Sequence, residues 1–92
     1  MSGNSSEYGG YTRLTATANV SPTNKALLGI LVAATTGGTI QFYDSATNTT
    51  AMPITGVITP TAGQFIPIKA YAIAGIYAVI GGTALDVTVI TV

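Results

Sequence analysis

The chain lacks the side chains on which most protein chemistry depends. It contains no His, no Cys and no Trp, and only three acidic and three basic residues occur among its 92. Charged residues make up 7% of the chain, against about 25% in ordinary soluble domains. The absence of Cys excludes disulfides and thiolate metal sites. Because three scattered cations cannot attract a phosphate backbone strongly, no nucleic-acid partner is expected.

Few combinations of the remaining polar residues could support catalysis. A Ser or Thr nucleophile needs a nearby base, and Lys25 and Lys69 fall in different predicted elements. Asp44 and Asp86 are the only carboxylates outside the N-terminal segment. We interpret Asp44 as a cap for the turn that follows it and Asp86 as a solvated strand residue, rather than as a glycosidase pair or calcium ligands. The sequence therefore predicts a protein that is not an enzyme and binds no cofactor or metal.

Apolar runs are present, but they are short. The longest cover residues 26–34 and 70–80, whereas a membrane-spanning helix needs about 20 apolar residues. The first seven residues have neither the basic region nor the apolar core of a signal peptide. We therefore expect no membrane partner and no export signal.

The chain is rich in residues that favour β-strands. β-Branched Thr, Ile and Val make up 33 of the 92 residues, and such side chains pack well on a pleated surface. Hydrophobic residues account for 48%, although so small a domain buries only about 60–70% of its unfolded surface. One interpretation is a monomer kept soluble by neutral polar side chains. We favour the other, in which apolar surface is covered by further copies or a larger partner, because a net charge near zero promotes association.

Turn-forming residues divide the chain into short strands. Residues 1–10 are rich in Ser, Gly and Asn and predict a flexible N-terminal arm, followed by a single domain over 11–92. Strands are predicted over 52–58 and 64–69, among others. The expected fold class is all-β, a small antiparallel β-sandwich or jelly roll of about seven or eight strands. The predicted turns lie at residues 21–24 and 59–63, and residues 45–51 are predicted to form a polar loop.

Two Gly-Gly pairs, at residues 37–38 and 81–82, predict β-hairpins, since two-residue hairpin turns need positive φ. A one-residue slip of the second hairpin would move Asp86 into the core, so its register is well specified. The expected core face of the first hairpin comprises Leu31, Ala33, Ile40 and Phe42. The expected core face of the second comprises Ile76, Ala78, Leu85, Val87 and Val89.

Residues 27–34 are apolar on both faces of the predicted strand, as in a strand covered on both sides. This segment is where we expect a partner to bind. Tyrosines are also common at interfaces, because one end of the side chain is apolar and the other can hydrogen-bond. The candidate interface residues are Tyr8, Tyr11, Arg13, Leu28, Ile30 and Val32.

Four segments resemble small β-sandwich structural proteins of tailed bacteriophages, which accompany the capsid as decoration or cement proteins. They are LLGILV at 27–32, GGTIQFYDS at 37–45, GIYAV at 75–79 and GGTALDVTV at 81–89. The resemblance covers about residues 25–92 and is carried by turn and strand motifs. It implies a protein on the capsid surface of the virion. Its expected partners are the major capsid protein and copies of itself, commonly in a trimer, bound through sheet faces and extended terminal arms.

The leading expectation is a passive structural protein that stabilises the assembled shell by binding to it. Two alternatives stay open. A tail or fibre component that binds a host glycan predicts an exposed aromatic cluster at a loop edge. A small secreted adhesion subunit would need an export route, for which the sequence shows no signal.

Overall fold

The computed structural model describes residues 10–92, which form an antiparallel sheet of five strands and contain no helix. The prediction of an all-β chain is confirmed. The predicted seven or eight strands are not found, because two pairs of predicted strands are single long strands. Gly10, the first residue of β1, was predicted to belong to the flexible arm. The other residues of that arm, 1–9, lie outside the described residues. The strands are β1 (Gly10–Leu14), β2 (Ala18–Ser21), β3 (Lys25–Asp44), β4 (Phe65–Ala72) and β5 (Ile76–Thr91).

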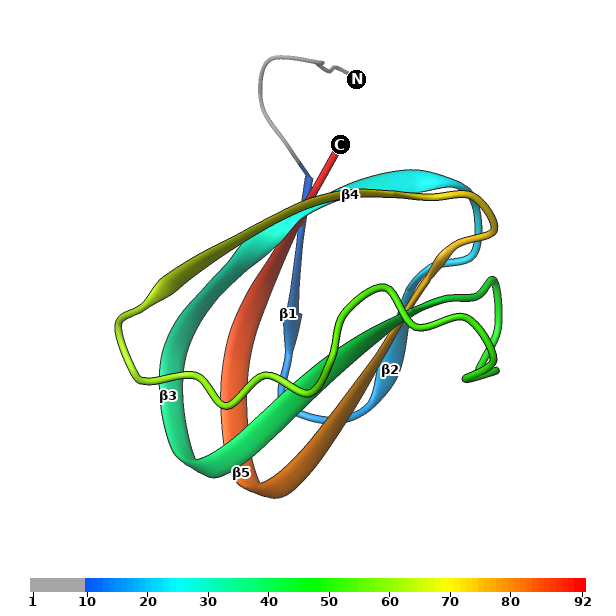
Figure 1. The fold of residues 1–92 in the computed structure, drawn as a ribbon. Helices are drawn as coiled ribbons and strands as arrows, with labels where there is room; N and C mark the ends of the chain where they lie inside the picture. Colours follow the sequence, from blue (N-terminus) through cyan, green and yellow to red (C-terminus); the bar gives the residue numbers. More distant parts are fainter. Residues whose placement is uncertain (1–9) are drawn as a thin grey trace.

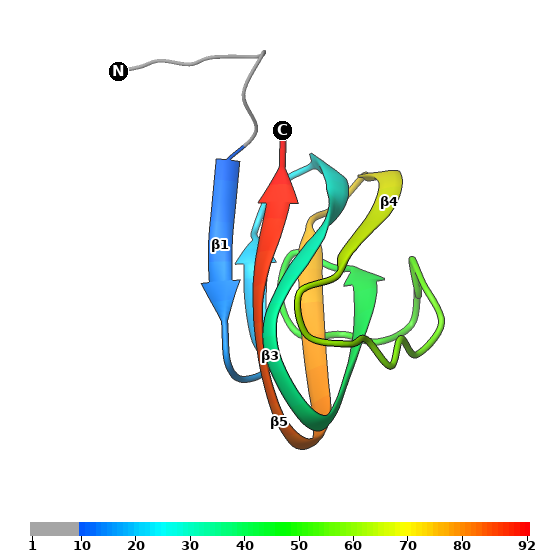
Figure 2. The ribbon, with the colours of Figure 1, turned by 90° about the vertical axis from the view of Figure 1, so that its left-hand side faces the viewer.

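The centre of the fold is a bent ribbon made of the two long strands. β3 and β5 pair along most of their length, from Leu27 opposite Thr91 to Asp44 opposite Ile76. Midway the ribbon bends sharply, so that its two halves face one another across the interior (Figures 1 and 2). The predicted hairpins at residues 37–38 and 81–82 are therefore wrong. Each Gly-Gly pair lies at the bend of a continuous strand, and the two bends lie side by side.

Glycine at the bend allows the two strands to approach closely. Gly38 lies opposite Gly82, and the strand register shifts on both sides of Gly37. Gly82 has a φ of 76°, and a Cβ atom there would overlap the carbonyl oxygen of Gly37. A Cβ atom on Gly38 would overlap the carbonyl oxygen of Ala84. The same residue type that favours a tight turn thus permits two paired strands to fold over together.

The shorter strands extend each half of the ribbon. β1 pairs with the second half of β5 and β4 with the first half of β3, so one half is four strands wide in the order β1-β5-β3-β4. β2 pairs with the first half of β5. The predicted strand over 52–58 is reduced to two isolated bridges, Ile40 with Ile58 and Tyr43 with Pro53. This segment runs beside the second half of β3.

Both halves of the bent sheet contribute to one hydrophobic core. All five residues of the predicted core face around residues 76–89 are buried, as expected. Around the Gly-Gly pair at residues 37–38, Ile40 and Phe42 are buried as expected. Leu31 and Ala33 were also predicted to be buried, but they are exposed, and Val32 is buried instead. The register shift between Val32 and Ala34 changes which residues face inward. The buried core comprises Leu14, Leu27, Ile30, Val32, Ile40, Phe42, Ala72, Ile76, Ala78, Leu85, Val87 and Val89.

Candidate functional site

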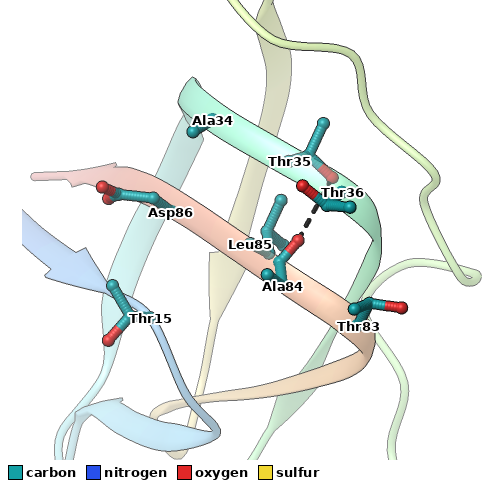
Figure 3. A pocket seen from close by; sticks show the side chains of 8 residues that line it. All are labelled: Thr15, Ala34, Thr35, Thr36, Thr83, Ala84, Leu85 and Asp86. Carbon is teal, nitrogen blue, oxygen red and sulfur yellow. Dashed lines mark hydrogen bonds between the residues drawn. The ribbon is translucent and has the colours of Figure 1, made fainter.

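A pocket of about 300 Å³ lies beside the bend (Figure 3). The hydroxyl group of Thr35 donates to the carbonyl oxygen of Ala84 at 3.4 Å and accepts from the amide of Gly38 at 3.1 Å. Asp86 is the one acidic or basic side chain in the lining. The lining residues are Thr15, Ala34, Thr35, Thr36, Thr83, Ala84, Leu85 and Asp86. Among residues 10–92 no three His, Cys, Asp or Glu side chains are placed to hold a metal ion.

The carboxylate of Asp86 is already engaged by a bidentate ion pair. Arg13 donates from Nε to Oδ1 at 2.9 Å and from Nη2 to Oδ2 at 2.6 Å. The hydrogen bonds from Arg13 hold the pKa of Asp86 below its usual value, and the same pairing raises the pKa of Arg13. The pair ties β1 to β5. Arg13 was predicted to contact a partner, and here its charge is matched within the chain while its side chain stays 68% exposed.

The second carboxylate, that of Asp44, fixes the turn between β4 and β5. It accepts hydrogen bonds from the amides of Ile73 at 2.9 Å, Ala74 at 2.8 Å and Gly75 at 3.3 Å. We predicted that Asp44 caps the turn after its own strand, but these amides lie some thirty residues along the chain. Hydrogen bonds from Ile73 and Ala74 lower the pKa of Asp44, because they favour the ionised carboxylate. The two carboxylates thus have separate structural roles.

Acid is expected to destabilise the fold partly through Asp44. Since its pKa is lower in the folded chain than the unfolded value of about 3.9, its contribution is complete above that value and is lost as pH falls through the folded pKa. The melting temperature should fall between about pH 5 and pH 2. An Asp44→Asn variant should melt lower at neutral pH and show a smaller acid-induced fall, with Asp86 supplying the remainder. Thermal unfolding followed by circular dichroism tests this, and equal falls in both chains would contradict it.

Large exposed apolar side chains gather on one side of the four-stranded half. Strand pairing places Leu31 opposite Phe65 and Tyr11 opposite Ile90, and residues opposed in an antiparallel pair point to the same face. Both neighbours of Ile90 on β5 are buried, so alternation directs Ile90 away from the core. We call this surface the outer face. Its most exposed members are Tyr11 (78%), Tyr71 (62%), Phe65 (52%), Leu31 (48%) and Val92 (47%).

Local contacts hold two of the aromatic rings on the outer face. A Cβ atom on Gly29 would lie 3.0 Å from the tip of the Phe65 ring, so the missing side chain at Gly29 lets that ring lie against β3. The hydroxyl group of Tyr71 accepts a hydrogen bond from the side-chain amide of Asn24 at 2.6 Å. These rings are therefore held in place while half or more of their surface stays exposed.

The solvent side of the other half is more polar and better paired. The rings of Tyr43 and Tyr77 lie against each other, with centroids 6.3 Å apart. The Tyr43 hydroxyl group donates to the Gln41 side chain at 2.8 Å, and Gln41 donates to the carbonyl oxygen of Thr55 at 2.9 Å. Apolar exposure on the sheet is thus concentrated on the outer face.

The predicted interface residues are dispersed by the fold. Ile30 and Val32 are fully buried in the core, so the expectation that they meet a partner is corrected. Leu28 is half-buried at the irregular position between Leu27 and Gly29. Tyr11 lies on the outer face, Arg13 is paired with Asp86, and Tyr8 lies outside the described residues.

Most residues of the outer face were not predicted from the sequence, although β4 carries a local signal for two of them. A period of two places Phe65, Lys69 and Tyr71 on one side of β4, and the charge of Lys69 marks that side as the solvated one. The structure exposes the same side. Phe65 and Tyr71 fall on the exposed side, and large apolar residues on a solvated side indicate a contact surface. Leu31 could not be identified in the same way, because the register shifts in β3 reverse its face.

Comparisons with known proteins give no assignment: no family model, no curated protein and no solved structure matches the chain. Among residues 10–92 there is no helix long and apolar enough to cross a membrane.

Proposed function

We propose that the chain is a non-enzymatic structural protein of a phage virion, a capsid decoration protein that binds the assembled shell through its outer face. The observation that carries the proposal is the set of exposed apolar side chains on that face. Among residues 10–92, five of the eight large hydrophobic residues that are exposed belong to it, and a contiguous apolar patch of this kind marks a contact surface. The bent sheet would serve as the small β-sandwich expected of such a protein, with its two halves as layers.

Binding would stabilise the shell passively. A protein that binds the assembled shell and not its separate subunits shifts the equilibrium toward assembly by mass action. Each square ångström of apolar surface covered contributes about 25 cal/mol before ordering costs, and several linked copies add avidity. The partners would be the major capsid protein and further copies of the chain, at the capsid surface.

The arrangement of the exposed aromatic residues favours this function over glycan binding. A glycan-binding tail or fibre module predicts an aromatic cluster at a loop edge. In the described part, Tyr11 belongs to β1 while Phe65 and Tyr71 belong to β4, and all three lie on the sheet. A broad sheet face suits a protein surface better than a single sugar ring.

Cosedimentation with shells assembled from the major capsid protein of the same virus tests the proposal. A chain with Leu31→Ser and Phe65→Ser should bind at least about tenfold more weakly than the unaltered chain, since two apolar anchors of the outer face are removed. A matched control carries Met52→Ser and Val57→Ser, which are similarly exposed but lie in the 45–64 loop. The control should bind like the unaltered chain. Equal binding by all three, or no binding by any, would contradict the proposal.

A further inference from the structure

The four-stranded half of the sheet ends in two edges, and one of them is protected against pairing. On the β4 side, Val32 donates to the carbonyl oxygen of Gln64 at 2.8 Å and accepts from the amide of Gly63 at 2.7 Å. Backbone groups alternate in direction along a strand. The N–H and C=O groups of Ile30 therefore also point toward β4, where the paired residue is Ile66. The backbone of Pro67, the next residue, then faces the free edge, where proline has no N–H to offer.

A second feature protects the same edge. Lys69 has a φ of 57°, a left-handed conformation that interrupts the regular extended backbone of β4. It lies where the pairing register of β4 shifts. Proline, an irregular backbone and an exposed lysine are the devices by which sheet edges avoid pairing with other chains.

The opposite edge, β1, has no proline and no left-handed residue among its described residues, and its one charged side chain, Arg13, is neutralised by Asp86. Ala26 and Val92 exchange both backbone hydrogen bonds, at 3.1 and 2.9 Å, so the backbone groups of Val92 face β3. Alternation along β5 then turns the backbone of Thr91 and Val89 toward β1, opposite Gly10 and Thr12. The residues of β1 that alternate with these two therefore point their backbone groups away from β5.

Those outward groups belong to Tyr11 and Arg13, each of which has an N–H and a C=O. β1 is the terminal strand of this half (Figure 2), and among residues 10–92 it pairs with β5 alone. Four adjacent hydrogen-bonding groups thus form a strip beside the outer face with which no described residue pairs. Unlike the β4 edge, this strip can accept another strand.

We propose that β1 pairs with β1 of a second copy of this chain, antiparallel and related by a two-fold axis at Thr12. In this register Tyr11 lies opposite the partner's Arg13, and Arg13 lies opposite the partner's Tyr11. Each opposed pair exchanges two backbone hydrogen bonds, so all four outward groups on both chains are satisfied. A two-fold contact needs a self-complementary surface, and this strip meets that requirement.

The side chains support the same partner. Tyr11 and Arg13 are both largely exposed on the outer face, so pairing would place each tyrosine ring beside a guanidinium group, an attractive combination. The net charge of zero gives two copies little mutual repulsion. The two outer faces would join into one wider apolar surface. This dimer does not depend on the proposed function, and it differs from the trimer that the phage resemblance implies.

Sedimentation equilibrium on the chain, at concentrations up to about 100 µM, tests the pairing with two variants of one residue. The unaltered chain should form dimers of twice the 9.3 kDa chain mass. Tyr11→Pro removes an N–H that bonds nothing within the described chain and should weaken dimerisation at least about 30-fold, because the two-fold axis removes two bonds at once. Tyr11→Thr keeps the N–H and should weaken it less than about tenfold.

Several outcomes would overturn the proposal: a monomer at all concentrations, a trimer, or equal association of Tyr11→Pro and Tyr11→Thr. Circular dichroism establishes whether Tyr11→Pro is folded. Should it not fold, amide hydrogen exchange in the unaltered chain decides instead. Exchange at Tyr11 and Arg13 should slow as chain concentration rises, and concentration-independent exchange there would refute the pairing. Shell binding is measured separately, so either proposal can fail alone.

Discussion

Gly82→Ala is expected to lower the free energy of unfolding by about 2–5 kcal/mol, since a left-handed backbone costs an L-residue about 1–2 kcal/mol and overpacking about 1–3 kcal/mol. The φ of Gly82 is 76°, and the added Cβ atom would overlap the carbonyl oxygen of Gly37 on the paired strand. One of the two bent strands must shift to relieve the overlap. Urea denaturation followed by circular dichroism measures the loss.

Alanine substitutions at two other glycines distinguish the cost of a strained backbone from the cost of atomic overlap. Gly63 has a φ of 80° and no atom within 4 Å of an added Cβ, so Gly63→Ala should cost only about 1 kcal/mol. Gly38 does not have a positive φ, but its Cβ would overlap the backbone of Ala84, so a loss there reports crowding alone. If Gly82→Ala and Gly38→Ala lower the free energy of unfolding no more than Gly63→Ala does, the close approach of the two bends would be contradicted.

Phe42→Ala should cost about 3–5 kcal/mol of stability, as expected for truncating a fully buried aromatic residue. Phe42 is fully buried and is the largest side chain of the core. A domain of this size has a total stability of about 5–14 kcal/mol, so the loss should be a large fraction of the total. Chemical denaturation is again the measurement.

Phe65→Ala is the matched comparison, because the same side chain is removed from the outer face. With 52% of Phe65 exposed, the expected loss is only about 1 kcal/mol, mainly the contact across Gly29. Shell binding should nevertheless decrease. A stability loss as large as that of Phe42→Ala would mean that Phe65 serves the fold, and it would remove the main reason to regard the outer face as a contact surface.

The strand content and one core face could be predicted from the sequence because they depend on local signals. Alternation around residues 76–89 identifies the buried residues whichever strand pairs with them, so Ala78 and Val87 are placed correctly although their predicted hairpin does not exist. The Gly-Gly pairs could not be interpreted from local sequence alone. A tight turn and a bend in a continuous strand both require glycine, and only the pairing of distant residues such as Gly38 and Gly82 distinguishes them.

The candidate site was harder to predict than the fold. The apolar segment at residues 27–34 does contribute to the exposed surface, but through Leu31 rather than Ile30 or Val32. Register shifts near Leu28 and Ala33 reverse which residues of the strand point into the core. Such shifts leave no clear pattern in the sequence. The contrast between the two sheet edges also depends on backbone direction, which follows from pairing and not from the identity of Tyr11 or Pro67.

The most direct test of the proposed capsid decoration role is the copy number of the chain in purified particles of the phage proposed to contain it. Quantitative mass spectrometry against the major capsid protein gives that number. A decoration protein distributed over the shell should be present in hundreds of copies per particle. A handful of copies, as for a tail or vertex component, or complete absence from the particle would contradict the proposed role.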